Sequence, residues 1–241
     1  MSAVSSVLVT GASGLLGTAV AQRLSREGIK VLGLCNKTSF PGLMAIDLLH
    51  RDAVLDLARL DWNAVVNCAA FKSPDFCEQN RELARVLNTE MPECLARMAE
   101  ARQAPFVHIS TDYVFPGTRP PYGEEDDVAP INFYGQTKVE AELAVREAHA
   151  EALVMRVPAL YGMPPPPVVS TMVQEGLDAS CSATPLVLDD VTVRFPTHVD
   201  DVAEVIAQAL AKRLVGILHV SAAEATTRYG LACRCLVHSA R

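Results

Sequence analysis

Apolar residues in this chain gather in short runs, and these runs alternate with longer stretches whose apolar positions have helical spacing. The runs lie at residues 4–9, 30–35, 63–68, 105–110 and 152–157, and the helical patterns at 15–27, 51–59, 82–102 and 132–149. The runs are apolar at consecutive positions, as in VLVT and FVHIS, which is typical of strands buried on both faces. Their alternation with helices predicts an α/β fold, a doubly wound parallel sheet covered by helices on both faces.

The pattern becomes less regular after Gly162. The proline run MPPPPVV at 163–169 predicts an extended loop, more typical of a stiff connector than of a ligand for an SH3-type domain. The elements expected after it are a helix near 169–178, a strand at 186–188, a helix at 199–212, a strand at 216–220 and a helix near 226–236. We therefore predict a larger domain over 1–162 and a small, incomplete lobe over 163–241, some of whose elements return to the core.

The hydropathy, the net charge and the cysteine content of the chain argue against several classes of function. No apolar run approaches the ~20 residues that span a bilayer, and the N-terminus has no basic start before an apolar core. The net charge of −7, without clustered Lys and Arg, argues against a nucleic-acid surface. Seven scattered cysteines lack metal-ligand spacing, so we predict reduced thiols, no metal site, no membrane contact and a cytoplasmic protein.

The stretch TGASGLLG lies where the first apolar run ends and the first helical pattern begins. The first turn of a helix leaves N–H groups unpaired and carries a partial positive charge, so it suits a diphosphate. Gly11 would permit a tight turn, Gly14 would let the diphosphate approach, and Gly17 would let the helix pack closely on the strand. Ordinary turn chemistry is the alternative, and the context has to decide between them.

The end of the second predicted strand would meet the ribose of a dinucleotide bound at that turn. Asn36 and Lys37 stand there in place of an acid, which favours NADP over NAD because a lysine attracts a 2′-phosphate. A solvated surface lysine is the alternative for Lys37. Asp47 would accept a hydrogen bond from the adenine amino group or would cap a helix. The small residues of NCAA, 67–70, would leave room for the cofactor or for a closely packed helix.

The stretch YGQTK places Tyr134 and Lys138 four residues apart, on one face of a predicted helix. An ammonium near a phenol lowers its pKa from about 10 towards the working range. Such a phenol exchanges a proton with an oxygen whose carbon exchanges hydride with a nicotinamide. Ser110 and Thr111 end the preceding strand, where a hydroxyl would bind the same oxygen. Tyr and Lys at this spacing also arise by chance in helices.

These ordered motifs, TGASGLLG, NCAA, STDYVF and YGQTK, resemble the extended short-chain dehydrogenase/reductase family over residues 5–235. The stretch STDYVFPGTRPPYGEEDDVAPINFYGQTK is similar to the branch that holds dTDP-4-dehydrorhamnose reductase and the regulatory beta subunit of methionine adenosyltransferase. RVPALYG (156–162) and RFPTHVDDVA (194–203) resemble the beta subunit. Reductases of the branch commonly carry a tryptophan near the position of Ala159, whereas Trp62 is the only tryptophan here.

The resemblance implies that NADP(H) is the cofactor. Its binding residues would be Thr10, Gly11, Ser13, Gly14, Leu15, Leu16, Gly17, Asn36, Lys37, Asp47, Leu48, Cys68, Ala69, Ala70, Tyr134, Lys138 and Pro158. Thr111, Tyr134 and Lys138 match the family's catalytic triad. Asp112, Arg194 and His198 are expected near the substrate cleft, with a structural role as the alternative for each.

The resemblance implies two functions. In the first, the chain is an NADP-binding regulatory subunit that associates with the catalytic subunit of methionine adenosyltransferase and modulates S-adenosylmethionine synthesis. In the second, it is an NADPH-dependent reductase of a nucleotide-linked 4-keto sugar. The triad favours the reductase, while the two later stretches and the missing tryptophan favour the regulator, which we prefer. A third hypothesis is a nucleotide-binding domain without a complete substrate lobe. Family members run some tens of residues further, so we expect a truncated or alternatively spliced chain.

Overall fold

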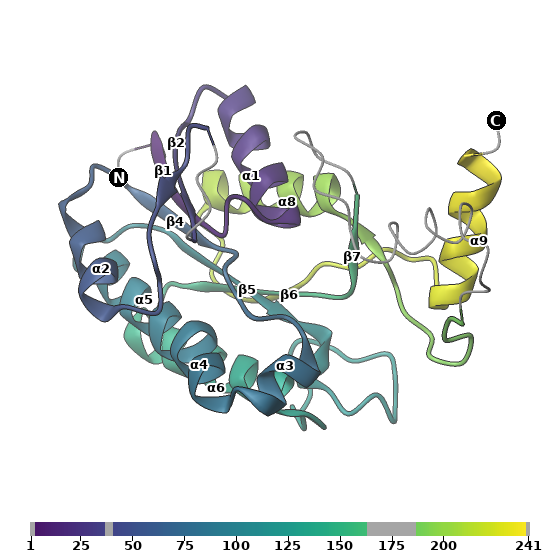
Figure 1. Ribbon diagram of the computed structural model, residues 1–241. Coiled ribbons are helices and arrows are strands. Elements are labelled where there is room, and N and C mark those ends of the chain that lie inside the picture. The colour runs from purple at the N-terminus through teal and green to yellow at the C-terminus, as the bar shows by residue number, and fades with distance from the viewer. Residues whose placement is uncertain (1–2, 37–40, 163–186, 240–241) are drawn as a thin grey trace.

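The computed structural model describes residues 3–36, 41–162 and 187–239 and contains three layers, a central sheet between two sets of helices (Figure 1). The strands are β1 (Ser6–Thr10), β2 (Lys30–Cys35), β3 (Met44–Ala45), β4 (Ala64–Asn67), β5 (Phe106–Thr111), β6 (Leu153–Val157), β7 (Leu160–Tyr161), β8 (Thr197–His198) and β9 (Gly216–His219). The helices are α1 (Leu15–Arg26), α2 (Arg51–Asp56), α3 (Pro74–Gln79), α4 (Arg81–Arg85), α5 (Met91–Ala101), α6 (Phe133–Ala148), α8 (Val199–Lys212) and α9 (Arg228–Ser239). Short helical turns are η1 (Leu57–Arg59), η2 (Val86–Glu90) and η3 (Asp112–Val114).

Within the described residues the central sheet has seven strands in the order β3-β2-β1-β4-β5-β6-β9, all parallel. The chain builds the sheet outward from β1 in one direction and then returns to extend it from β4 in the other. The order therefore reverses between β1 and β4, and ligands of such sheets bind beside the carboxyl ends of the strands at this point. The predicted doubly wound parallel fold is confirmed.

Two of the three apolar clusters in the described residues lie against the two faces of the sheet and hold the layers together. Alternate residues of β1 point to opposite faces of the sheet: Val7 and Val9 to one, Leu8 to the other. The first core lies under α1 and α8, and the second lies under α2 and α5, on the side where α4 and α6 also lie (Figure 1). Because both faces are covered, the strands need apolar residues at consecutive positions, which explains the runs in the sequence.

Two elements from beyond residue 162 join this sheet domain. Strand β9 pairs in parallel with β6, and α8 packs beside α1 with Val202, Ile206 and Leu210 buried in the first core. Arg23 on α1 donates to the Glu204 carboxylate on α8 over 2.5 Å. The division of the chain at residue 162 remains a prediction.

Several elements differ from the sequence expectation. The helix expected at 82–102 begins at Arg81, and its turns widen at η2, where the buried Asn88 side chain bonds the backbone of Phe71. The sequence did not predict β3, α3 or the two-stranded pair β7–β8. Residues 187 and 188 form no strand, and residue 186 lies outside the described residues, as do the loop and helix expected at 163–178.

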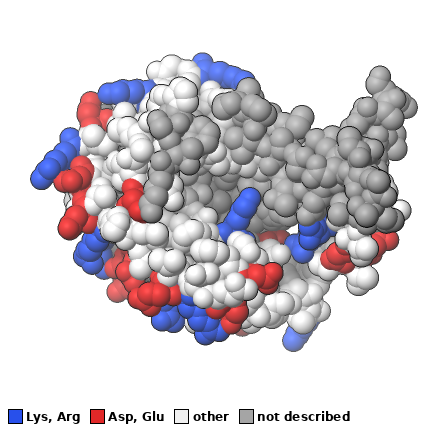
Figure 2. Space-filling view, in the orientation of Figure 1, with Lys and Arg blue, Asp and Glu red and all other residues white. Residues whose placement is uncertain are grey.

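Helix α9 lies at the end of the molecule away from β1 (Figure 1). It is held by the segment before β8: Tyr229 N donates to the Asp189 carbonyl, and Thr227 Oγ1 donates to the Asp190 carboxylate over 2.6 Å. No helix in the described part of the chain is long and apolar enough to cross a membrane. Figure 2 shows acidic and basic side chains interspersed along the rim of one face, with uncharged surface between them.

Candidate functional site

The glycine turn after β1 is built around backbone contacts that only glycine permits. Gly11 has a φ of 62°, and a Cβ there would lie 3.0 Å from the Ala69 backbone. A Cβ on Gly17 would lie 2.1 Å from the Gly11 carbonyl oxygen, so any side chain at 17 would push the helix away from the turn. Gly14 is the N-cap of α1, without a side-chain hydrogen bond and with no acid in the first turn. The first N–H groups of α1 therefore remain available to an anion.

This turn forms one end of a cleft of about 750 Å³ at the carboxyl ends of the strands. Apart from Thr10 and Lys37, all of the predicted cofactor residues line it: Gly11, Ser13, Gly14, Leu15, Leu16, Gly17, Asn36, Asp47, Leu48, Cys68, Ala69, Ala70, Tyr134, Lys138 and Pro158. Thr10 lies behind the wall, where its Oγ1 accepts from Ala69 N over 3.1 Å. Lys37 is outside the described residues.

The end of β2 and the loop after β3 form the far wall of the cleft. Asn36 directly follows β2, as predicted. Asp47 Oδ1 accepts from Leu49 N over 3.1 Å, so the carboxylate orders the turn that leads into α2 while the residue also lines the cleft. The two alternatives for Asp47, adenine contact and local capping, are thus compatible with one position.

The predicted catalytic residues meet at the opposite wall. Thr111 ends β5, and Tyr134 and Lys138 lie on the buried face of α6. Asn132 caps α6 by accepting from Gly135 N over 2.8 Å. A Cβ on Gly135 would lie 2.3 Å from the Tyr113 carbonyl oxygen, so the start of α6 sits directly on η3. This close contact brings the Tyr134 phenol into hydrogen-bonding range of the Thr111 side chain.

The electrostatics of Tyr134 differ from the sequence expectation. We predicted that the Lys138 ammonium lowers the pKa of the phenol. Burial instead raises the pKa of Tyr134 well above its usual value, with Asp112 adding to the rise and the hydrogen bond to Thr111 opposing it. Residue spacing places both groups on one helix face, but it does not include the loss of water around the phenol. The phenol is consequently held protonated, as a proton donor, at neutral pH.

Lys138 is buried in this wall of the cleft, with 2% of its surface exposed. Its Nζ donates to the Ile109 carbonyl over 2.7 Å and lies 3.1 Å from His108 Nε2. Burial lowers the pKa of Lys138 to about 8, with Glu142 opposing the shift. Burial also raises the pKa of the Cys68 thiol to about 12, so this thiol is neutral and unreactive.

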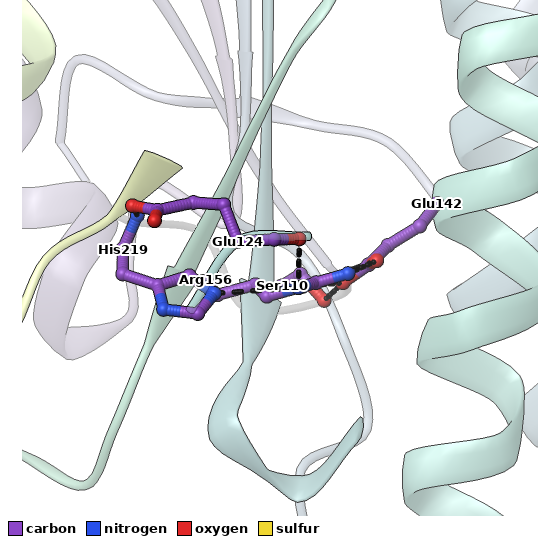
Figure 3. A network of polar contacts seen from close by, with 5 residues as sticks. All are labelled: Ser110, Glu124, Glu142, Arg156 and His219. Carbon is purple, nitrogen blue, oxygen red and sulfur yellow. Dashed lines mark hydrogen bonds and ion pairs between the residues drawn. The ribbon is translucent and has the colours of Figure 1, made fainter. Parts of the chain in front are cut away.

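An ionic network lies next to the wall that contains the predicted catalytic residues, and Figure 3 shows its five members. Arg156 on β6 forms a bidentate pair with Glu142 on α6, the Nη2–Oε2 distance being 2.7 Å. Ser110, next to Thr111, donates to the same carboxylate. Arg156 Nη1 also donates to the Glu124 carbonyl, and His219 N donates to the Glu124 carboxylate. The network thus fixes α6 relative to β5, β6 and β9.

Two of the three residues expected near a substrate, Asp112 and Arg194, line the cleft although they lie far apart in the sequence. Arg194 lines the cleft and donates from Nη1 to the Tyr113 hydroxyl over 3.0 Å. Asp112 also lines it and accepts from Thr111 Oγ1 over 3.2 Å. His198, in contrast, caps α8 by accepting from Asp200 N and does not line the cleft. The alternative of a structural role therefore fits His198.

Sequence reasoning missed several residues of the cleft wall: Ile46, Leu49, Phe71, Lys72, Ser73, Pro74, Leu87, Tyr113 and Arg228. The stretch from Phe71 to Pro74 follows NCAA, and Ser73 caps α3 ahead of Pro74 at its first position. This serine–proline pair is a helix-start signal that the sequence offered. Arg228 had no comparable signal, because only the fold brings the start of α9 to the cleft.

A family model described as RmlD substrate binding domain matches residues 5–240. Methionine adenosyltransferase 2 subunit beta of Pongo abelii is 39% identical over 236 residues, covering 94% of this chain and 70% of the relative. A probable low-salt glycan biosynthesis reductase of Haloferax volcanii is 34% identical over 233 residues, covering 91% and 75%. The crystal structure of dTDP-4-dehydrorhamnose reductase from Bacillus anthracis in complex with NADP has a TM-score of 0.87 at 26% identity, covering 100% of this chain and 82% of that one.

Proposed function

Because the chain belongs to the RmlD substrate binding domain family, within the extended short-chain dehydrogenases/reductases, we propose that it is an NADP-binding regulatory beta subunit of methionine adenosyltransferase. In this role it associates with the catalytic subunit and modulates the synthesis of S-adenosylmethionine, in the cytoplasm. The observation that carries the proposal is the 39% identity with such a beta subunit over 94% of the chain. The reductases compared above are less similar, at 34% and 26%.

The glycine turn supports a dinucleotide in the cleft. A Cβ on Gly17 would clash with the Gly11 carbonyl and a Cβ on Gly11 would crowd the Ala69 backbone, and the first turn of α1 has no acid that would repel a diphosphate. Gly11, Ser13 and Gly14 would hold the diphosphate, and the small side chains of Ala69 and Ala70 would leave room for the cofactor. Bound there, NADPH would supply a hydride at the catalytic wall.

NADP is proposed over NAD on two grounds. Asn36 lines the cleft after β2, where NAD-binding proteins carry an acid that would repel a 2′-phosphate. The similar structure from Bacillus anthracis contains NADP. The preference does not depend on the position of Lys37, since the amide of Asn36 in place of a carboxylate already removes the repulsion.

A second candidate function is reduction of a nucleotide-linked 4-keto sugar. The observation that favours it is the assembly of Thr111, Tyr134 and Lys138 at one wall of the cleft. The Tyr134 phenol is held protonated and would donate its proton to a carbonyl oxygen, while the Thr111 hydroxyl would orient that oxygen. A binding subunit has no chemical need for this set.

Calorimetric titration tests the cofactor and the partner in sequence. The purified chain is titrated with NADPH and with NADH, and then with a catalytic methionine adenosyltransferase subunit. Preference for NADPH followed by saturable association supports the regulatory proposal. Gly14→Asp places a carboxylate against the diphosphate and should abolish NADPH binding, whereas Gly123→Asp, in the loop before α6, makes the same charge change away from the cleft.

Tyr134→Phe separates the two candidate functions. In a reductase, loss of the proton donor lowers turnover of the keto sugar by a factor of about 100 or more. In a regulator, association with the catalytic subunit persists in this variant, because the phenol takes no part in holding the partner. NADPH binding without association, together with keto-sugar turnover that Tyr134→Phe removes, would replace the regulatory proposal by the reductase.

A further inference from the structure

A row of buried polar side chains crosses the sheet beneath Lys138. Thr10 on β1, Asn67 on β4 and His108 on β5 are partners in the strand register, Thr10 beside Asn67 and Asn67 beside His108. Each has at most 1% of its surface exposed. Polar groups in such a position are costly unless hydrogen-bonded, so the bonds of this row restrict where its hydrogens lie.

The row runs from the glycine turn to the catalytic wall without a break. At one end Thr10 Oγ1 accepts from the backbone N–H of Ala69, the residue packed against Gly11. Thr10 Oγ1 lies 2.5 Å from Asn67 Oδ1, and Asn67 Nδ2 lies 3.0 Å from His108 Nδ1. At the other end His108 Nε2 lies 3.1 Å from Lys138 Nζ.

Counting the hydrogen-bond donors along the row determines which ring nitrogen of His108 carries the hydrogen. Thr10 has one hydroxyl hydrogen and donates it to Asn67 Oδ1. Asn67 Nδ2 then faces His108 and donates to Nδ1, which therefore carries no hydrogen. A neutral imidazole with a bare Nδ1 carries its hydrogen on Nε2. This N–H is directed at Lys138 Nζ.

An ammonium is a poor partner for that N–H because it has three hydrogens and no lone pair. An uncharged amine has a lone pair that accepts from Nε2, and its own hydrogens still donate to the Ile109 carbonyl, 2.7 Å away. The bonds of the row are therefore fully matched only when Lys138 is uncharged.

We propose that His108 is a positioning residue for Lys138: held by Asn67 and Thr10, it directs an N–H at the lysine nitrogen and thereby favours the uncharged amine. The charged form requires the Asn67 amide to turn by half a rotation, so that Oδ1 accepts from His108 Nδ1 and Nε2 accepts from the ammonium. One amide rotation thus links the proton on Lys138 to the hydrogen bond between Asn67 and Thr10, the residue before the glycine turn.

The other groups that face Lys138 act in both directions. Burial has the largest effect and lowers the pKa of Lys138. Glu142 on α6 and Cys68 after β4 raise it by less, so that the pKa is about 8. Burial and the neighbouring Lys138 lower the pKa of His108, which keeps the imidazole neutral. The consequence for the dinucleotide rests on the proposed function: near pH 8 the amine would change from donor only to donor and acceptor towards a ribose hydroxyl.

The tautomer of His108 is measured on the unmodified chain. Long-range proton–nitrogen NMR correlations distinguish the two ring nitrogens of each of the six histidines, and the His108→Gln variant assigns the signal. The hydrogen is expected on Nε2 at pH 9. A hydrogen on Nδ1, or a charged ring, would overturn the proposal without reference to any variant's stability.

The second measurement tests whether the row acts on the lysine. Asn67→Asp keeps the acceptor for Thr10 but replaces the donor to His108 by an oxygen, which moves the histidine hydrogen to Nδ1 and makes Nε2 an acceptor. NMR titration of labelled lysine side chains, of which the chain has five, follows Lys138 directly. The midpoint is expected to rise by about one pH unit or more, together with the tautomer change.

Asn63→Asp is the matched control, since it makes the same change just before β4, where Asn63 Oδ1 accepts from Ser5 N and Ser6 N. It should leave both the Lys138 midpoint and the His108 tautomer unchanged. A raised midpoint in Asn67→Asp without a change of tautomer would overturn the proposal, because added charge alone would then explain it. All measurements use the chain without a dinucleotide, so failure of NADPH to bind would count only against the proposed function.

Discussion

Gly17 contributes to the candidate site through the side chain that it lacks. The helix carrying it lies so close to the turn that a Cβ would be 2.1 Å from the Gly11 carbonyl oxygen. That atom belongs to backbone, which cannot rotate away as a flexible side chain would. The position of the first turn of α1, and with it the direction of the unpaired N–H groups, thus depends on residue 17 having a hydrogen atom in place of a side chain.

Gly17→Ala should therefore weaken NADPH binding by a factor of about 10 or more and lower the free energy of unfolding by about 1–3 kcal/mol. The cause is displacement of α1 from the turn. Gly123→Ala is the control, since its Cβ would meet only the Asp126 carboxylate, at 3.9 Å. Calorimetry and urea denaturation measure the two effects. If Gly17→Ala and Gly123→Ala had the same NADPH affinity and the same free energy of unfolding, the turn would tolerate the displacement of α1.

Lys138 makes stability depend on pH. Its pKa falls from 10.5 to about 8 on folding, so between these values the unfolded chain binds a proton that the folded chain has lost. The free energy of unfolding should therefore rise with pH through this window, by up to about 3 kcal/mol relative to Lys138→Met. Urea denaturation of both proteins at pH 7, 8.5 and 10 measures the difference. Parallel pH profiles would mean that folding leaves the pKa of Lys138 unchanged, so that the lysine is not desolvated in the folded chain.

At the scale of elements, the network around Arg156 and Glu142 connects α6, which carries the predicted catalytic residues Tyr134 and Lys138, to three strands (Figure 3). Both side chains of the pair are 5% exposed. Removing one member leaves the other charge buried without its partner, which costs far more than an ion pair on the surface. The placement of α6 thus depends on a pair that the sequence separates by 14 residues.

Arg156→Met should lower the free energy of unfolding by about 3–5 kcal/mol, because it leaves the Glu142 carboxylate buried and unpaired. The double variant Glu142→Leu/Arg156→Met should regain part of that loss. The control is Arg97→Met, which breaks the exposed pair with Glu93 on α5 and should cost less than about 1 kcal/mol. Urea denaturation of the unchanged chain, of the single variants Glu142→Leu and Arg156→Met and of the double variant gives the coupling energy of the pair. A double variant no better than Arg156→Met would argue that packing, not charge, holds α6.

At the scale of the molecule, residues from beyond position 162 complete the sheet domain. Helix α8 buries Val202, Ile206 and Leu210 in the core that also contains Val7 and Val9 of β1. Trp62 lies in the other core, across the sheet. If the sheet and α8 unfold as one unit, a substitution in the first core changes the unfolding midpoint that a probe in the second core reports.

Ile206→Ala should lower the free energy of unfolding by about 2–5 kcal/mol, since Ile206 is fully buried. The fluorescence of Trp62, the only tryptophan, and far-ultraviolet circular dichroism should report the same lowered midpoint in urea. Leu143→Ala, at a residue 63% exposed on α6, is the control and should change little. A Trp62 transition that Ile206→Ala does not move would favour a separate unit after residue 162, in line with the predicted division.

Much of the fold and of the cleft could be predicted from the sequence. The runs that predicted β1, β4, β5 and β6 match them to within two residues at each end. All of the predicted cofactor residues except Thr10 and Lys37 line one cleft. The strands were predicted from local spacing, and the full set of cofactor residues from the resemblance that the ordered motifs carry. Arg228 and the polar partners of Lys138 could not be found this way, because each reaches the site through a long-range contact.

The sequence by itself determined the alternation of strands and helices, the glycine turn and the presence of Thr111, Tyr134 and Lys138 in order, because each of these follows from residue type at short spacing. Only the tertiary structure decided the register that aligns Asn67 with His108, and the desolvation that raises the pKa of Tyr134 and lowers that of Lys138. Strand register and burial depend on the packing of distant segments, which residue spacing along the chain does not contain.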